Sequence, residues 1–279
     1  MWNLSYLTHT NLCILFIIIV IIICYYIYQN NKKYKVVSVY KNDTYFGLGD
    51  YIRGIIHLYQ VEKVKDIKVD YSNHPISKYI KNAYGNNDIC FEKPIVTNEK
   101  TYRNLTNEKI SVCIEHNGMP DYPIEKNIKE KVKKIFTPKK ILEEKINSTM
   151  ESLKLIPKKF VVLHIRIEDD QMMVKNVTIP KKIKDISSIL QKMNVPVLVL
   201  SNSYTMKQMI CKTFGFLTTS TKPIHTGLIH GSGDVGDTLL DFFLVSQSVH
   251  IYQYTNMENF QSGFTQRIAE LYDIPTTQI

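Results

Sequence analysis

The sequence predicts an α/β protein: two Rossmann-like domains behind a single N-terminal transmembrane helix. Three observations support this class. Short β-branched runs alternate with helical patterns, the alternating series restarts near residues 156–159, and an uncharged apolar segment precedes both series. The length of 279 residues suits about two domains, and 44% apolar residues are enough for a sizeable core. The expected divisions are a tail at 1–11, an anchor at 12–28, a linker at 29–33, and domains at 34–156 and 157–279.

The anchor is the first predicted element. Residues 1–31 contain no Lys, Arg, Asp or Glu, and residues 12–28 (LCILFIIIVIIICYYIY) are all apolar or aromatic. A helix of that length reaches roughly 25 Å, at the short end of a membrane span. Tyr25, Tyr26 and Tyr28 would lie at one membrane interface. A cleaved signal peptide is the alternative, but a basic segment before the apolar run and a small-residue cleavage site are both missing. A buried soluble helix is the other alternative.

The side of the membrane stays open. Lysines follow the apolar segment between residues 32 and 41, which by the positive-inside rule favours a cytoplasmic C-terminal part. Possible N-glycosylation triplets favour instead a lumenal glycoprotein of the Golgi, the endoplasmic reticulum or a host membrane. These triplets begin at Asn3, Asn42, Asn104, Asn147 and Asn176.

The first domain is expected to alternate strands with amphipathic helices. Residues 34–40 (YKVVSVY) are rich in Val and predict a strand, and Ile52, Ile55, Ile56 and Tyr59 share one face of a helix at 50–64. Further strands are expected at 67–71 and 110–116, and further helices at 125–135 and 139–155.

The second domain is expected to be more strongly apolar. Residues 160–165 (FVVLHI) and 195–201 (VPVLVLS) are nearly continuous apolar runs, typical of parallel strands buried on both faces. A short strand is expected at 249–252, and helices at 181–193, 204–214, 237–245 and 262–272. Ligands of such folds bind beyond the carboxyl ends of the strands.

The charge balance does not favour a nucleic-acid partner. The chain has 35 Lys+Arg against 26 Asp+Glu, a net charge of +9. Between residues 125 and 145, however, lysines alternate with glutamates, which is typical of a solvated helix face. The five cysteines form no C-x-x-C pair and no H-E-x-x-H occurs, so a disulfide scaffold and a conventional zinc site are not expected.

The first candidate site follows the first strand. In residues 46–54 (FGLGDYIRG), Gly47 and Gly49 flank a turn where a backbone can approach a ligand, and Asp50 starts an amphipathic helix. The alternative is structural: the glycines make the turn and Asp50 caps the helix.

The second candidate site ends the strand at 160–165. Alternation along the strand puts His164 and Arg166 on one side, and three acids follow at 168–170. An arginine there can hold a diphosphate with two parallel hydrogen bonds. The alternative is that Arg166 pairs with the acids that follow it.

The third candidate region lies near the C-terminus. Residues 231–236 spell G-x-G-x-x-G, but no clear strand precedes them, so a glycine loop competes with a dinucleotide site. Further on, residues 261–265 (QSGFT) begin the last helix, and a helix N-terminus with hydroxyl groups suits a phosphate. Simple capping by Ser262 is the alternative.

Taken together and in this order, these segments resemble the fucosyltransferase superfamily, which includes α1,2-, α1,6- and protein O-fucosyltransferases. The resemblance covers roughly residues 46–275. It is carried by GLGD, FTPKKI, FVVLHIRIEDD, VLVLSN, DTLLDFFLVSQS and NFQSGFT. It implies the two-domain GT-B architecture, GDP-fucose as donor, a glycan or protein acceptor, inversion at the anomeric carbon and no metal in the active site. A single N-terminal anchor is common among its animal members.

The resemblance also implies roles for the donor side. Arg166 would hold the diphosphate, with His164 beside it. Ser262, Phe264 and Thr265 match the turn whose hydroxyl and amide groups bind phosphate.

On the acceptor side, Gly47 and Gly49 match the family's glycine turn. Asp50 is then the expected catalytic base together with Arg166 as the second catalytic residue, and Asp169 and Asp170 are the other candidates for the base. Asp241 matches an acidic position in the preceding helix.

Two other functions remain open. One is a non-catalytic single-pass membrane protein whose GT-B-like domain only binds a glycan or partner. The other is a dinucleotide oxidoreductase built on residues 231–236.

Overall fold

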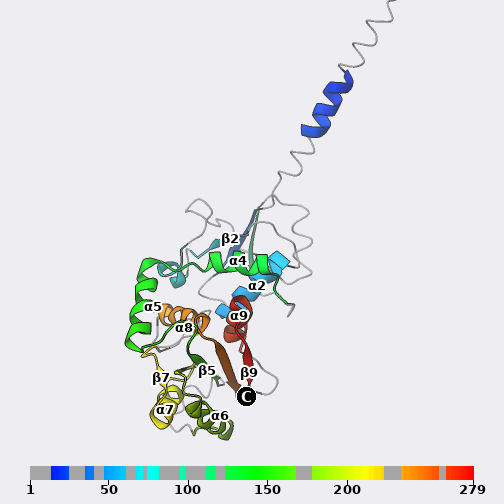
Figure 1. The fold of residues 1–279 in the computed structure, drawn as a ribbon. Helices are drawn as coiled ribbons and strands as arrows, with labels where there is room; N and C mark the ends of the chain where they lie inside the picture. Colours follow the sequence, from blue (N-terminus) through cyan, green and yellow to red (C-terminus); the bar gives the residue numbers. More distant parts are fainter. Residues whose placement is uncertain are drawn as a thin grey trace, which may run out of the picture.

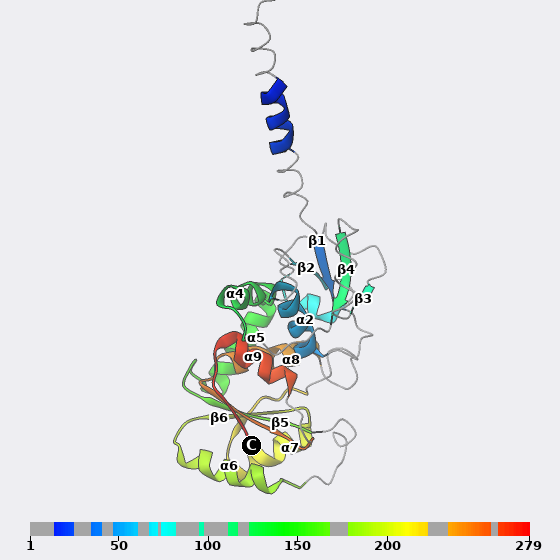
Figure 2. The ribbon, with the colours of Figure 1, turned by 90° about the vertical axis from the view of Figure 1, so that its right-hand side faces the viewer.

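The described part of the chain forms two β-sheets of parallel strands, with a layer of helices between them and the helices α6 (Lys181–Lys192) and α7 (Tyr204–Phe214) beneath the second sheet (Figure 1, Figure 2). The computed structural model describes residues 14–24, 35–40, 47–60, 67–71, 74–81, 95–97, 111–116, 123–167, 178–222, 234–257 and 262–279.

The first sheet has the strand order β2-β1-β4-β3 within the described residues, and all its pairs are parallel. Its strands are β1 (Lys35–Val39), β2 (Ile67–Asp70), β3 (Ile95–Thr97) and β4 (Ser111–His116). Helix α2 (Leu48–Gln60) follows β1. Its apolar side chains are buried almost all round, with Ile52, Ile55 and Leu58 fully inaccessible. Most of the circumference of α2 is covered, because the helix lies between the first sheet and the helices α4 (Lys126–Ile135) and α9 (Gly263–Tyr272).

The second sheet has the order β7-β6-β5-β8-β9, again parallel among the described strands. Its strands are β5 (Val161–Arg166), β6 (Val197–Ser201), β7 (Leu217–Thr218), β8 (His250–Thr255) and β9 (Thr276–Gln278). Figure 2 shows α6 and α7 below this sheet and α8 (Val235–Ser246) and α9 above it.

Alternation along β5 divides the core of the second sheet into two parts. Val161, Leu163 and Ile165 pack with the apolar residues of α6 and α7. Val162 faces the other way, into a larger cluster under α8 and α9. His164 and Arg166 therefore belong to the face that α8 and α9 cover.

The larger cluster joins the two halves of the chain. It runs from α2, α4 and α5 (Lys140–Ser152) to α8 and α9. The ring centroids of Phe136 and Phe242, for example, lie 6.0 Å apart. The predicted division at residues 156 and 157 falls between α5 and β5 and stays a prediction.

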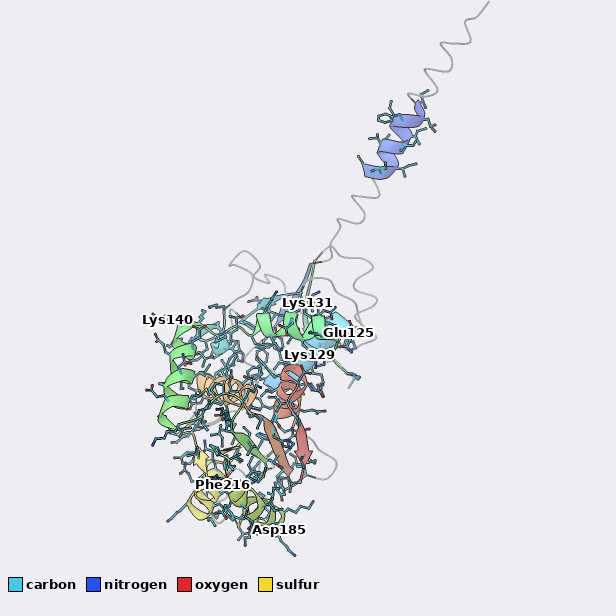
Figure 3. All side chains as sticks on the ribbon, in the orientation of Figure 1. Glu125, Lys129, Lys131, Lys140, Asp185 and Phe216 are labelled. Atoms are coloured by element: carbon cyan, nitrogen blue, oxygen red, sulfur yellow. The ribbon has the colours of Figure 1, made fainter. Side chains whose placement is uncertain are left out.

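The lysine-rich helix α4 has the solvated face that its sequence predicts. Only Ile128, Val132 and Ile135 are buried in it. Figure 3 shows Lys129 and Lys131 on this helix, where Lys129 pairs with Asp273.

Most predicted elements are present, with different ends. The helix expected at 50–64 begins earlier, at Leu48, because the glycine turn already belongs to it. The helix expected at 237–245 begins at Val235, because Asp234 caps it. The strand expected at 249–252 extends to Thr255, since pairing with β5 continues past its apolar part. The short strands β3, β7 and β9 were not predicted.

The apolar N-terminal segment is described only in part. Residues 14–24 form a helix whose large apolar side chains from Ile14 to Ile23 are 40–67% exposed. In the portion of the chain that the structure describes, no helix combines the length and the apolar character that a membrane crossing requires. Residues 12–13 and 25–28 of the predicted anchor lie outside the described residues.

Candidate functional site

The candidate site lies where β5, β6 and β8 end. Arg166 is the last residue of β5 and is in register with Thr255 of β8. Just beyond it, the backbone N–H of Ile167 donates to Oδ1 of Asn202 (2.9 Å), and Nδ2 of Asn202 donates to the carbonyl of Ile167 (2.7 Å). This paired bond holds the chain as it leaves β5, so Arg166 has a defined position at the carboxyl edge of the sheet.

His164 connects this edge to helix α9. Its side chain is buried, its Nδ1 lies 3.3 Å from Oγ1 of Thr265, and its ring centroid lies 6.2 Å from that of Phe264. Burial, helped by the positive charge of Arg166, lowers the pKa of His164 to about 3. His164 is therefore a neutral hydrogen-bonding group at physiological pH.

The N-terminus of α9 is buried at the same place. Ser262 is the N-cap residue and is buried, but its side chain makes no capping hydrogen bond. Ser262 therefore holds the capping position, but its hydroxyl does not make the capping bond that the alternative expected. The first backbone N–H groups of a helix have no partner within it, and they carry the positive end of the helix dipole. The first turn of α9 thus offers donors to an anion.

A second helix N-terminus meets the first. A Cβ atom added to Gly49 in α2 would lie 2.5 Å from the carbonyl carbon of Gly263 and 2.7 Å from the backbone nitrogen of Phe264. Only a glycine at position 49 permits this approach. The glycine turn predicted as the acceptor side and the turn predicted as the donor side are therefore in direct contact.

Asp50 lies beside this contact, in the first turn of α2. Its Oδ2 accepts a hydrogen bond from the backbone N–H of Gly47 (3.3 Å), and its Oδ1 accepts one from Nη2 of Arg53 (2.8 Å). A Cβ atom on Gly263 would be 3.9 Å from the same Oδ1. The capping alternative for Asp50 is thus present in the structure. The side chain is also 35% exposed, at the junction of the two helices.

The site favours an anion overall. The N-termini of α2 and α9 meet at one place and bring positive potential there, and Asp50 pairs with Arg53. His164 is neutral, and the positive charge of Arg166 is close enough to lower its pKa. The residues at 168–170, including Asp169 and Asp170, lie outside the described residues, as does the alternative that pairs Arg166 with them. Among the residues that are described, no group of three or more His, Cys, Asp or Glu side chains could hold a metal ion.

The glycine pattern at 231–236 has a packing role at its last position. Asp234 caps α8 by accepting from the backbone N–H of Gly236 (3.0 Å), and its other oxygen accepts from the hydroxyl of Tyr79 (2.5 Å). A Cβ atom on Gly236 would lie 2.6 Å from the ring of Tyr79. Gly236 therefore makes room for Tyr79, and this packing explains the glycine at position 236 without a bound dinucleotide. Residues 231–233 lie outside the described residues.

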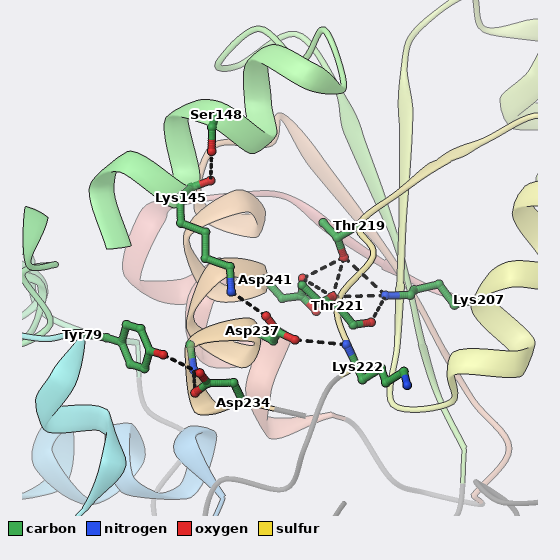
Figure 4. Close-up of polar contacts among 11 residues, drawn as sticks. Tyr79, Lys145, Ser148, Lys207, Thr219, Thr221, Lys222, Asp234, Asp237 and Asp241 are labelled. Atoms are coloured by element: carbon green, nitrogen blue, oxygen red, sulfur yellow. Dashed lines mark hydrogen bonds and ion pairs between the residues drawn. The ribbon is translucent and has the colours of Figure 1, made fainter. Parts of the chain in front are cut away.

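Asp241 belongs to a buried polar network that the sequence did not reveal (Figure 4). Nζ of Lys207 donates to the carbonyl of Thr221 (2.7 Å) and to the hydroxyls of Thr219 and Thr221 (3.3 and 3.2 Å). The same hydroxyls lie 3.3 and 3.4 Å from Oδ1 of Asp241. Burial raises the pKa of Asp241 to about 6 and lowers the pKa of Lys207. The network ties the segment after β7 to α7 and α8, so Asp241 supports the fold.

Comparison with known proteins places the fold. No protein-family model matches the sequence, and no curated protein matches it. Solved structures match most of the chain. The α-1,6-fucosyltransferase NodZ, in crystals soaked with GDP-fucose, gives a TM-score of 0.54 at 11% identity, over 86% of this chain and 92% of its own. A variant of Arabidopsis thaliana FUT1 in complex with GDP gives 0.55 at 12% identity, over 88% of this chain and 70% of its own. The apo form of POFUT1 gives 0.50 at 10% identity, over 88% of this chain and 98% of its own.

The chain therefore has a fucosyltransferase-like α/β fold with parallel sheets, as the resemblance in its sequence implied.

Proposed function

We propose that this protein is a glycosyltransferase that transfers fucose from GDP-fucose to a glycan or protein acceptor, with inversion. The observation that carries the proposal is the meeting of two helix N-termini, through Gly49 and Gly263, in front of the strand end that bears His164 and Arg166. Two proteins of the same fold have been crystallised with GDP-fucose or GDP, which supports this donor.

The donor's diphosphate would lie against the first turn of α9. Its oxygens would accept hydrogen bonds from the backbone N–H groups there and from the hydroxyl of Ser262, and Arg166 would supply the compensating charge. Thr265 has another role than direct phosphate contact, because its hydroxyl already lies within hydrogen-bond distance of Nδ1 of His164. We assign Thr265 as a positioning residue for the imidazole, and Phe264 as the apolar wall beside it.

Transfer requires one bond to form and one to break. The acceptor oxygen attacks the anomeric carbon, the bond from that carbon to the phosphate oxygen breaks, and GDP leaves with the bonding electrons. Arg166 and the α9 N-terminus stabilise the charge that develops on the leaving phosphate. The acceptor proton goes to a carboxylate, and Asp50 is the described carboxylate next to the junction. Asp169 and Asp170 remain the alternatives on the donor side.

We further propose that the two sheets are the two Rossmann-like domains of a GT-B enzyme, at 34–156 and 157–279. The apolar segment 12–28 would anchor the chain in a membrane of the secretory pathway or of a host cell. No cofactor or metal is needed in this mechanism, because the leaving phosphate is stabilised by Arg166 and backbone N–H groups.

A second function is favoured by one observation. Asp50 is held by Arg53 and by the N–H of Gly47, as a structural carboxylate would be. A protein that binds a GDP-sugar or glycan without transferring it would retain the same geometry.

The proposed function is tested by offering the full chain, in detergent, a panel of sugar nucleotides that includes GDP-fucose, UDP-galactose and CMP-sialic acid. Hydrolysis or transfer from GDP-fucose alone supports a fucosyltransferase. Binding of GDP-fucose without turnover supports the non-catalytic function. Absence of both binding and turnover with every nucleotide sugar rejects the transferase and the GDP-sugar-binding protein.

A further inference from the structure

Gln253 is a buried polar side chain whose amide donor is unused. It lies in the middle of β8 and is 5% exposed. Its Nε2 atom is buried and has no hydrogen-bond partner in the structure. A buried donor without a partner destabilises a protein, because the group has lost its bonds to water and gained nothing in return. A buried donor of this kind is therefore expected to have a function that offsets its cost in stability.

The register of the sheet places Gln253 inside the candidate site. Gln253 pairs with His164 of β5, and the next position on the same face is Thr255, which pairs with Arg166. Side chains two residues apart in a strand point to the same face, so Gln253 shares the face of His164 and Arg166. The bond of His164 to Thr265 shows that the first turn of α9 covers this face.

We propose that the carboxamide of Gln253 belongs to the donor site and donates its N–H to an oxygen of the donor's diphosphate. This inference rests on the proposed function and adds to it a residue that neither the motifs nor the fold identified. Gln253 lies two residues before Thr255, the sheet partner of Arg166, on the face covered by the α9 N-terminus, where positive potential attracts an anion. Its Nε2 atom can only donate hydrogen bonds. A bound diphosphate would satisfy the unused donor without adding charge.

The inference predicts opposite effects of one substitution on stability and on GDP binding, which a purely structural role of Gln253 does not predict. Replacing Gln253 by Met or Leu removes the unpaired donor and keeps an apolar side chain of similar size. The unliganded protein should then become more stable, while its affinity for GDP falls by roughly tenfold or more, the loss expected for one hydrogen bond to a charged group.

Ser187 provides the matched control. Its side chain is fully buried in α6 and its Oγ is also without a partner, but it packs beneath the opposite face of the sheet. Ser187→Ala should also stabilise the unliganded protein, and it should leave GDP affinity unchanged.

The experiment measures GDP binding by calorimetry and the melting temperature without ligand, for the full chain and for Gln253→Met, Gln253→Leu and Ser187→Ala. Inorganic pyrophosphate is used as a competitor of GDP. We expect the affinities for GDP and for pyrophosphate to fall together in the two Gln253 variants. In Ser187→Ala both affinities should equal those of the wild type.

The outcomes are distinct. Equal GDP affinity in wild type and folded Gln253 variants overturns the inference and leaves the proposed function standing. A loss for GDP without a loss for pyrophosphate places the contact on the nucleoside and also overturns it. Absence of GDP binding in the wild type rejects the proposed function, and the inference with it.

Discussion

Gly49 in α2 lies directly against the backbone of Gly263 in α9, so close that a Cβ atom on Gly49 would be 2.5 Å from the carbonyl carbon of Gly263. The two residues are more than two hundred positions apart and come from the two halves of the chain. Their contact brings the acceptor-side turn and the donor-side turn into one site. The contact requires glycine at position 49 but not at position 263, because a Cβ atom on Gly263 would approach only Oδ1 of Asp50, at 3.9 Å.

This asymmetry predicts different outcomes for the two alanine variants. Gly49→Ala forces the helices apart and should lower the free energy of unfolding by about 1–3 kcal/mol, with a parallel loss of GDP binding. Gly263→Ala is the matched control and should change stability by no more than about 0.5 kcal/mol. Denaturant unfolding and GDP titration of both variants check the contact. Equal tolerance of the two substitutions would mean that the helices do not meet as described.

The role of Asp50 is tested by Asp50→Asn, which keeps the size of the side chain and most of its capping ability. If Asp50 accepts the acceptor's proton, turnover should fall by roughly 10²-fold or more while GDP binding persists. Asp237 gives the control, since it is also a first-turn aspartate in an ion pair, with Lys145 at 2.6 Å. The Asp237→Asn variant should turn over at the wild-type rate. A wild-type rate in Asp50→Asn would remove Asp50 from the mechanism and return attention to Asp169 and Asp170.

His164 should make the fold sensitive to acid. Its pKa of about 3 in the folded protein lies below the unfolded value near 6.5, so the neutral ring stabilises the fold fully above pH 6.5. That contribution is lost as the pH falls from 6.5 toward 3, by about 2 kcal/mol between pH 7 and pH 5. Asp241, with its pKa raised to about 6, acts in the opposite direction over the same range. The pH dependence of the wild type's unfolding free energy must therefore be compared with that of a variant that lacks His164.

His164→Gln isolates this contribution, because it leaves Asp241 unchanged. Urea unfolding at pH 7 and pH 5 should show wild type losing about 2 kcal/mol more than the variant over this interval. If both lose the same amount, His164 is not buried as a neutral group.

The membrane anchor is tested by fractionation. Residues 12–28 are uncharged and just long enough to span a bilayer, so the full chain should sediment with membranes and resist carbonate extraction. Removing residues 1–31 should release the remainder. Recovery of the intact chain in the soluble fraction would contradict the prediction.

Local patterns were enough to predict the elements that carry the site. The apolar run 160–165 predicted β5 with His164 and Arg166 on one side, and 262–272 predicted α9 to within one residue. Contacts between distant segments were not predictable in this way. Gly49 and Gly236 have ordinary turn signatures, and only the folded chain shows that each makes room for a particular neighbour, the α9 turn or Tyr79.

Buried polar groups were equally hidden. Lys207 lies in a helix that also carries exposed polar residues, so nothing in its neighbourhood indicates that its ammonium group is buried among threonines. Gln253 lies between two tyrosines in a strand, and its importance depends on the register with His164, which the sequence does not contain. Alternation within one strand predicts faces, whereas partners across strands depend on the whole sheet.

The central claim is that the end of β5 and the first turn of α9 bind the diphosphate of a GDP-sugar. The most direct measurement is a calorimetric titration of the full chain with GDP, repeated with Arg166→Lys, which keeps the charge but loses the paired hydrogen bonds. We predict that GDP binds the wild type and that the substitution weakens binding by about 1.5–3 kcal/mol in a folded protein. Failure of the wild type to bind GDP, or unchanged affinity in a folded Arg166→Lys variant, would contradict the claim.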